Sequence, residues 1–201
     1  HPNKKVTSAR SAPPAVSSAA AKQQAKADTE DPQIKQSESS SGTAVNATSL
    51  TSVSGRANGI DVSKWQGTID WGKVKAAGID FAMIRIGFRG ENGTIYKDSY
   101  ADYNIQSAVS AGVKVGVYFY STAVSTDEAQ QEASWVISQI SGYSISYPVA
   151  FDSEGYHTSG SRTYSLSKSS RTAIARTFLS KISSSGYEPV LYSAVSGTKN
   201  A

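Results

Sequence analysis

Two carboxylates stand two residues apart in the stretch Pro148-Val-Ala-Phe-Asp-Ser-Glu154. In a β-strand, residues two apart point to the same face, and their Cα atoms lie about 6.6 Å apart. Because two close carboxylates do not easily ionise together, one of them keeps its proton while the other stays anionic. A proton donor beside an anion is the arrangement that cleavage of a glycosidic bond requires. The Asp-x-Glu triplet alone is common, however, and a solvated strand end would explain it equally well.

Further polar side chains share the face that carries Asp152 and Glu154. If the apolar residues of each strand meet helices, alternation places polar residues of several strands on the opposite face. These are Asp61, Arg85, Tyr118, Tyr120 and Tyr192. Each lies near the carboxyl end of its strand, where barrel enzymes carry their catalytic groups. Inward charges at several strand ends are costly without a wet site or mutual pairing.

Four of these residues also have a purely structural interpretation. Asp61 could cap the loop or helix that follows it. Arg85 could be a counter-ion that neutralises the acidic cluster. Tyr118 and Tyr120 could stack on sugar faces or could simply fill the inside of a barrel. The residue types alone leave these alternatives open.

Strand-like runs alternate with helical stretches from residue 58 onward. We expect strands over residues 59–62, 79–87, 113–120, 148–154 and 188–193, and helices over 71–77, 99–111, 126–141 and 167–185. The third helix opens with the capping-box pattern Ser125-Thr-Asp-Glu128, and a glycine follows each helix. Successive βα units indicate a parallel sheet with right-handed crossovers. The sheet could be open or the first part of a barrel, but the Gly-rich fingerprint of a nucleotide-binding sheet does not follow the first strand.

Residues 1–57 differ sharply in composition from the rest of the chain. All 19 aromatic residues lie after position 57, and the earlier stretch is rich in Ser, Ala and Thr. A stretch with so little to bury cannot offset its ordering entropy, so we predict a disordered linker over residues 1–57. This stretch also holds +3 of the formal net charge of +4. The remainder is almost neutral, which argues against a nucleic-acid partner.

The composition excludes several other classes of site. The 201 residues include no Cys and two His, so a thiol nucleophile, a zinc finger and a multi-His metal site are not expected. No apolar run reaches the roughly 18–20 residues that span a bilayer. Since the sequence begins with His rather than Met, a signal peptide or anchor would lie outside this segment.

Several motifs together resemble glycoside hydrolase family 25, the lysozymes (N-acetylmuramidases). The opening Gly59-Ile-Asp-Val-Ser-Lys-Trp-Gln-Gly67, followed by Ile69-Asp-Trp71, is similar to the start of that family. The resemblance continues through the strand-like segments, which are 81–87, 111–120, 148–154 and 186–192. It implies a TIM-like (β/α) barrel, of which this chain holds the first five βα strands while the C-terminal strands are missing. Residues 58–201 would then be a partial catalytic domain.

The resemblance also implies an activity and a set of roles. The expected reaction is cleavage of the β-1,4 bond between N-acetylmuramic acid and N-acetylglucosamine in peptidoglycan, with retention and with the substrate's acetamido group as nucleophile. By position, Glu154 matches the general acid, Asp152 its partner and Asp61 the acid of the first strand. Arg85, Tyr118, Tyr120 and Tyr192 are the expected substrate-binding residues. We expect no cofactor or metal, a monomer, and a secreted or wall-associated bacterial protein.

Two alternative functions remain open at this point. Without the last strands the chain could be a remnant that holds glycan without cutting it, although Asp61, Asp152 and Glu154 are intact. A chitinase-like glycosidase is the other alternative. That class tends to carry a longer acidic run before its Glu, whereas residues 149–151 here are Val, Ala and Phe.

Overall fold

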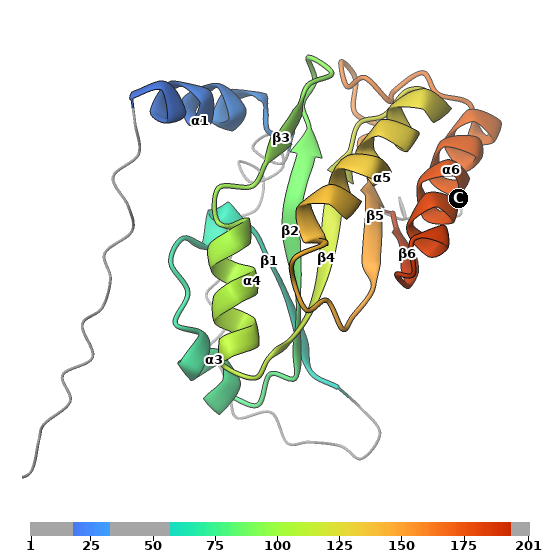
Figure 1. Ribbon diagram of the computed structural model, residues 1–201. Coiled ribbons are helices and arrows are strands. Elements are labelled where there is room, and N and C mark those ends of the chain that lie inside the picture. Colours follow the sequence, from blue (N-terminus) through green and yellow to red (C-terminus); the bar gives the residue numbers. More distant parts are fainter. Residues whose placement is uncertain (1–17, 33–56, 194–201) are drawn as a thin grey trace, which may run out of the picture.

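The computed structural model describes residues 18–32 and 57–193 (Figure 1). Its centre is a sheet of parallel strands in the order β1-β2-β4-β5-β6, and β3 pairs antiparallel with β2. The strands are β1 Gly59–Val62, β2 Phe81–Arg89, β3 Ile95–Lys97, β4 Lys114–Ser121, β5 Val149–Ser153 and β6 Pro189–Tyr192. The five predicted strands are therefore confirmed to within two residues at each end, and so is their parallel arrangement.

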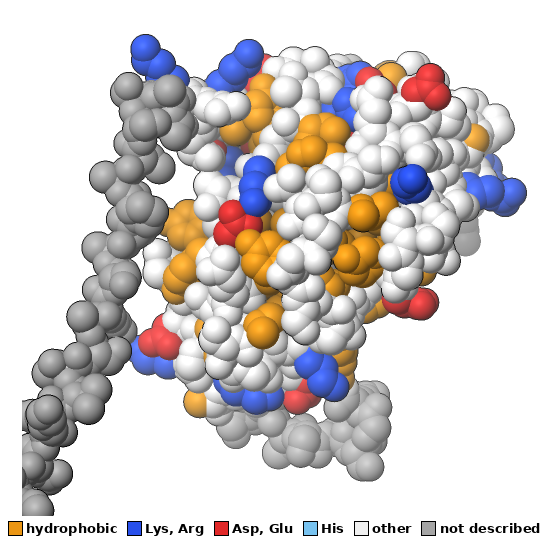
Figure 2. Space-filling view, in the orientation of Figure 1, with side chains coloured by type: hydrophobic (Ala, Val, Ile, Leu, Met, Phe, Trp, Pro, Cys, Tyr) orange, Lys and Arg blue, Asp and Glu red, His pale blue; other side chains and the backbone are white. Residues whose placement is uncertain are grey.

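Helices connect the parallel strands and cover one face of the sheet (Figure 1). They are α3 Trp71–Ala76, α4 Ala101–Ser110, α5 Thr126–Ile140 and α6 Lys168–Ser184, with a short 3₁₀ turn η1 Lys64–Gln66 after β1. On this side, hydrophobic side chains gather in the middle of the surface (Figure 2). Across the described ranges, no helix combines the length and apolar character needed to cross a membrane.

The helix ends follow local sequence signals. At the start of α5 the Ser125 side chain accepts a hydrogen bond from the Glu128 backbone at 3.2 Å, as the capping-box pattern predicts. The Glu128 carboxylate instead accepts from the Val124 backbone at 2.9 Å, one residue earlier than a regular box would have it. Of the four glycines after helices, three have a left-handed φ: Gly78, Gly112 and Gly186. The same prediction for Gly142 is wrong, because its φ is not positive.

The hydrophobic core lies between the sheet and the helices. On β4 the alternate residues Val115, Val117 and Phe119 are fully buried against helices, as strand alternation predicts. Phe119 and Phe151 pack on Phe178 of α6, with ring centroids 6.4 and 4.9 Å apart. Because this face is apolar, the opposite face of the strands carries the polar side chains.

The end of β2 has a feature that the sequence analysis did not anticipate. Its pairing with β4 shifts between Arg85 and Gly87, which marks a bulge, and the strand then turns into a hairpin with β3. The bulge allows Arg85 and, three residues later, Phe88 to lie on the same side of the sheet. Gly87 is tightly enclosed, since a Cβ placed there would lie 2.5 Å from the Tyr96 carbonyl oxygen.

A helix occupies part of the predicted linker. Residues Ser18–Glu30 form α1 (Figure 1), and the burial of Asp31 and Pro32, which follow it, is nearly complete. The prediction of disorder therefore does not describe residues 18–32, because Ala27 and Asp31 pack against the sheet with exposed fractions of 4% and 2%. Residues 1–17 and 33–56 lie outside the described residues. The division of the chain near residue 57 stays a prediction.

The barrel is not closed within the described residues. There, β1 and β6 form the two edges of the sheet, each with one neighbouring strand. Apolar strand residues are expected to meet helices, but the Leu191 side chain on β6 is 53% exposed, because no described element covers the far side of this edge strand. The fold is therefore the first part of a TIM-like barrel, open between β1 and β6.

Candidate functional site

One row of side chains crosses the carboxyl ends of neighbouring strands. Tyr120 of β4 pairs in register with Asp152 of β5, which in turn pairs with Tyr192 of β6. Neighbouring strands lie about 4.8 Å apart, so these three residues are direct neighbours on the inner face. Glu154 follows immediately after β5. The structure thus places the two predicted catalytic carboxylates in the middle of an aromatic row.

Asp152 has an unusual environment for a carboxyl group. It is 4% exposed, and its Oδ1 atom is buried with no hydrogen-bond donor among the described residues. Burial, followed by the nearby charge of Glu154, raises the pKa of Asp152 to about 8, although Arg85 acts in the opposite direction. Asp152 therefore keeps its proton at neutral pH.

Glu154 begins a loop whose backbone is held at several points. The Glu154 carbonyl accepts from Thr163 at 3.3 Å, and the Gly155 carbonyl accepts from Ser161 at 2.8 Å. Gly155 has a φ of +79°, which favours glycine at this turn. The Glu154 side chain is half-buried. Its carboxylate therefore sits on a folded loop rather than on a free strand end.

Arg162 ties this loop to the rest of the domain. Its guanidinium donates to both carboxylate oxygens of Glu128 at 2.7 and 3.2 Å and to the Thr122 carbonyl at 3.0 Å. Its backbone N–H donates to Glu91 in the β2–β3 hairpin at 2.8 Å. Sequence analysis missed Arg162, because nothing in its local sequence distinguishes it. The capping-box pattern did single out Glu128, which is one of the residues that Arg162 contacts.

Asp61 and Tyr192 share the electrostatic field of the catalytic pair. Asp61 is exposed on β1, and its charge contributes to the raised pKa of Asp152. The charge of Glu154, followed by burial and by the charges of Asp152 and Asp61, raises the pKa of Tyr192. Burial raises the pKa of Tyr118, where the charges of Asp61 and Asp152 add to the effect. Arg85 also acts on Asp152, and the carboxylate pair acts on Tyr120, so all seven predicted site residues are linked electrostatically to this pair.

Arg85 lies in a buried ion cluster. Its Nε donates to Asp98 at 2.8 Å, and its two terminal nitrogens donate to the two oxygens of Asp31 at 3.0 and 2.7 Å. All three side chains are 0% exposed. The counter-ion interpretation of Arg85 is thus correct in kind, but the acids that it contacts are Asp98 and Asp31. Its predicted contact with substrate stays a prediction.

Tyr120 is covered in this structure. It is 3% exposed and packs in one apolar cluster with Ala27, Phe88 and Tyr96. Burial, together with the charges of Glu154 and Asp152, raises the pKa of its hydroxyl. Tyr192, by contrast, is 56% exposed and open to a ligand. The two tyrosines beside Asp152 therefore differ in accessibility, and both predicted binding roles stay predictions.

A family comparison agrees with this site. The model for glycosyl hydrolases family 25 matches residues 60–201, which include β1 with Asp61 and β5 with the carboxylate pair. The matched region begins after α1, so the helix and Asp31 lie outside it.

Curated proteins and solved structures give the same picture. Lysozyme M1 from Streptomyces globisporus is 37% identical over 112 residues, 54% of this chain and 36% of that protein. The autolytic lysozyme from Clostridium acetobutylicum is 34% identical over 97 residues, 48% of this chain and 28% of that protein. Among solved structures, a muramidase from Acremonium alcalophilum is 28% identical with a TM-score of 0.57, covering 69% of this chain and 65% of that one. The chain matches only about a third of the length of the curated relatives.

Proposed function

Because the chain belongs to glycosyl hydrolases family 25, we propose that it cleaves the β-1,4 bond between N-acetylmuramic acid and N-acetylglucosamine in peptidoglycan. The observation that supports this proposal is the carboxylate pair at the end of β5, in which Asp152 is buried with a raised pKa beside the more accessible Glu154. Two carboxyl groups in unlike environments are what acid–base cleavage of a glycoside needs.

We assign the proton donor to Glu154. It stands at the start of a loop on the open side of the strand end, from which its longer side chain can reach a glycosidic oxygen. After donating its proton to the leaving group, the same carboxylate would activate the attacking water. Asp61, exposed on β1, would help to position water or neighbouring groups.

Asp152 would orient the acetamido group of the substrate. Its buried Oδ1 lacks a donor among the described residues, and an amide N–H of the sugar would supply one. Donation to this oxygen favours the ionised form of Asp152. The resulting anion would stabilise the positive charge of an oxazolinium-like intermediate. The reaction would proceed with net retention and without a cofactor.

The aromatic row would bind the glycan. Tyr192 is exposed beside Asp152, and its ring can stack on a sugar face. Tyr118 lies nearer the floor of the same face, one residue pair below Asp152. A peptidoglycan substrate places the site of action at the bacterial cell wall, outside the membrane, and a monomer would suffice for it.

The test compares Glu154→Gln with a matched control. Glutamine keeps the shape of the side chain but cannot act as an acid, so release of reducing sugar ends from wall material should fall by about 10²–10⁴-fold. Glu188→Gln, an exposed change before β6 at the opposite end of the sheet, should leave the rate unchanged. Near-normal activity of Glu154→Gln would contradict the assignment. Equal release from chitin and from peptidoglycan would favour a chitinase-like enzyme instead.

Glycan binding without cleavage is a second candidate function. The open sheet between β1 and β6, with its exposed Tyr192, favours this alternative. Co-sedimentation of the chain with wall material, in the absence of any new reducing ends, would be its signature. If Glu154→Gln co-sediments with wall material as well as the unaltered chain does but no longer lyses it, the result supports the proposed hydrolase activity.

A further inference from the structure

Two buried basic side chains, Lys64 and Arg85, lie on the part of the sheet next to the carboxylate pair, because Arg85 on β2 is in register with Tyr118 on β4 and β4 is the neighbour of β5. We call this site the basic pocket, and the chain fills it with one of its own carboxylates. Lys64 and Arg85 form the walls, with side-chain exposures of 6% and 0%. Asp31 occupies it: both of its oxygens accept from Arg85, and one lies 3.1 Å from the Lys64 ammonium. A planar guanidinium that meets both oxygens of a carboxylate is a geometry specific for that group.

The occupant comes from outside the matched domain. Asp31 follows α1, whereas the family match begins at residue 60. Lys64 and Arg85 lie inside the match, on η1 and β2. The α1 segment (residues 18–32) reaches them by placing Ala27 on the apolar cluster and Glu30 against Gly90, where a Cβ would lie 3.0 Å from the Glu30 Cβ. The pocket therefore belongs to the domain, and its occupant does not.

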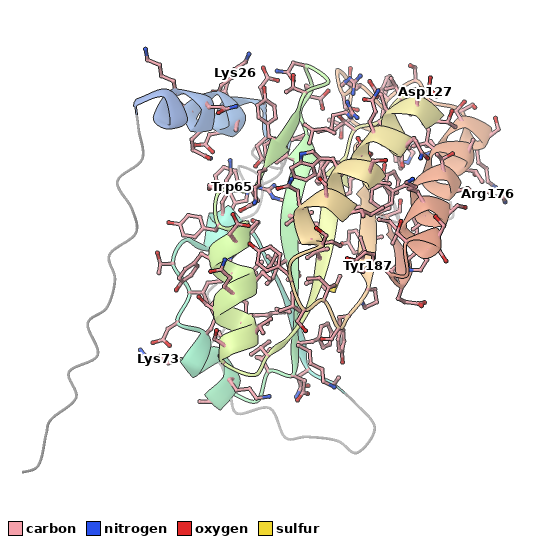
Figure 3. The ribbon with its side chains drawn as sticks, in the orientation of Figure 1. Lys26, Trp65, Lys73, Asp127, Arg176 and Tyr187 are labelled. Carbon is pink, nitrogen blue, oxygen red and sulfur yellow. The ribbon has the colours of Figure 1, made fainter. Side chains whose placement is uncertain are left out.

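The pocket is close to the proposed chemistry. The charge of Arg85 acts on the pKa of Asp152, and the charge of Asp31 acts on Tyr120, the in-register neighbour of Asp152. Ala27 belongs to the same buried apolar cluster as Tyr120. In Figure 3, Trp65 lies below α1 at the end of the sheet where the segment docks, and the Lys64 ammonium is 4.6 Å from its ring centroid.

The charges of the cluster also favour an acidic ligand. Lys64 and Arg85 bring two positive charges, and Asp98 of the same domain brings one negative charge. Asp98 is engaged further by the backbone N–H groups of Lys64 and Tyr100 at 3.0 and 2.9 Å. Without Asp28 and Asp31 of the α1 segment, one cation of this cluster would lack its balancing carboxylate. With the segment docked, Asp28 and Asp31 supply carboxylates to these two buried cations.

We infer that Lys64 and Arg85 form a carboxylate-binding subsite of the catalytic face, and that Asp31 of the α1 segment occupies it in competition with a carboxylate of the substrate. The inference rests on the proposed function, because peptidoglycan carries such groups. They are the lactyl carboxylate of N-acetylmuramic acid where it is free, and the carboxylates of the peptide stem. Docking of the α1 segment thereby covers part of the glycan-binding face.

The test measures binding of small ligands by calorimetry to the full chain and to Asp31→Asn. N-acetylmuramic acid carries the lactyl carboxylate, muramyl dipeptide carries only a peptide carboxylate, and N-acetylglucosamine carries neither. In Asp31→Asn, residue 31 no longer places a negative charge between Lys64 and Arg85, so it competes less well with a ligand carboxylate. This variant should therefore bind one of the two acids about 10–100-fold more tightly than the unaltered chain. The acid that gains identifies the source of the carboxylate. N-acetylglucosamine should gain much less than that acid.

Two further variants separate the pocket from general loosening. Ala27→Lys places a charge in the apolar cluster and should undock the segment without touching the pocket, so it should reproduce the gain. Adding Lys64→Gln to Asp31→Asn should remove the gain. Asp127→Asn, on the exposed start of α5 (Figure 3), is the matched control and should change nothing. Circular dichroism melts establish that each variant is folded at the assay temperature.

The inference is overturned if neither acid gains affinity in Asp31→Asn and Ala27→Lys, or if N-acetylglucosamine gains as much as the acids. The second outcome would mean that the segment is a steric cover without a carboxylate pocket beneath it. Wall lysis measured on the same proteins tests the proposed activity separately from the proposed carboxylate subsite. A chain that never cleaves the wall refutes the proposed function, whereas the binding ratios still decide the subsite.

Discussion

Asp152→Asn should make the protein more stable at neutral pH while removing its proposed activity. Burial and Glu154 raise the pKa of Asp152 to about 8 from an ordinary value of 3.8. Between these values the folded state holds a proton that the unfolded chain has released. The free energy of unfolding therefore falls as pH rises through this window. Asparagine has nearly the shape of the protonated carboxyl group but does not titrate, so it removes this loss.

The size of the effect follows from the proton count. One extra proton bound by the folded state costs about 1.4 kcal/mol of unfolding free energy per pH unit. Between about pH 5 and pH 7, the unaltered chain should lose about 2.7 kcal/mol relative to Asp152→Asn. Glu132, whose pKa burial raises to about 7, adds a slope of the same sign to both proteins, so it cancels in the comparison.

The assay is urea unfolding of both proteins at about pH 5, 6 and 7, followed by circular dichroism. Asp127→Asn is the control, because an exposed carboxylate is surrounded by water in both states and should leave the slope unchanged. Parallel pH curves for Asp152→Asn and the unaltered chain would refute the reasoning, since they would mean that Asp152 is already ionised in the folded protein at neutral pH. A gain in stability with a loss of lysis is the combination expected at a catalytic residue.

Three other perturbations test the surroundings of the site. Glu132→Gln should remove the fall in unfolding free energy that the raised pKa of Glu132, about 7, produces between about pH 5 and pH 7; a pH dependence equal to that of the unaltered chain would contradict this. Arg162→Gln should lower the lysis rate about tenfold or more with little change in wall binding, because a loosened loop after β5 misplaces the general acid; an equal loss of binding would point to a contact with substrate instead. Gly116→Ala should destabilise the fold by about 1–3 kcal/mol in urea titration, because the added Cβ would lie 2.7 Å from the Pro148 carbonyl oxygen; tolerance would show that β4 and β5 can move apart.

Alternation of apolar residues was sufficient to predict the strands and, on the central strands β4 and β5, the face of the side chains. Asp152 and Glu154 could be placed at a strand end because an apolar run leads directly into them, and helix periodicity located α5 and α6 to within one residue. These predictions rest on local patterns of known period. Elements without such a pattern were missed: β3 has three residues, and the bulge in β2 shifts the register by one position without any marker in the sequence.

The partners of Arg85 could not be predicted for a different reason. Asp31 lies 54 positions earlier in a stretch with almost no apolar residues, and composition alone indicates disorder there. What holds the α1 segment is a small number of buried ion pairs with one alanine, and such contacts leave no periodic trace. The interpretation of Arg85 as a counter-ion was available from its type, but the acid that it meets depends on long-range packing.

The covalent connection between Asp31 and its pocket makes the docked segment a tethered ligand. Between residues 32 and 57 the chain has 24 residues, so the two ends can separate by at most about 85 Å. One carboxylate confined within that radius corresponds to an effective concentration of about 0.6 mM or more. A free sugar acid that binds the pocket as tightly as the Asp31 carboxylate must exceed this concentration before it displaces Asp31. A sugar acid that binds more tightly needs a proportionally lower concentration. A polymer that presents many carboxylates together would reach this threshold at a lower bulk concentration than a free sugar acid does.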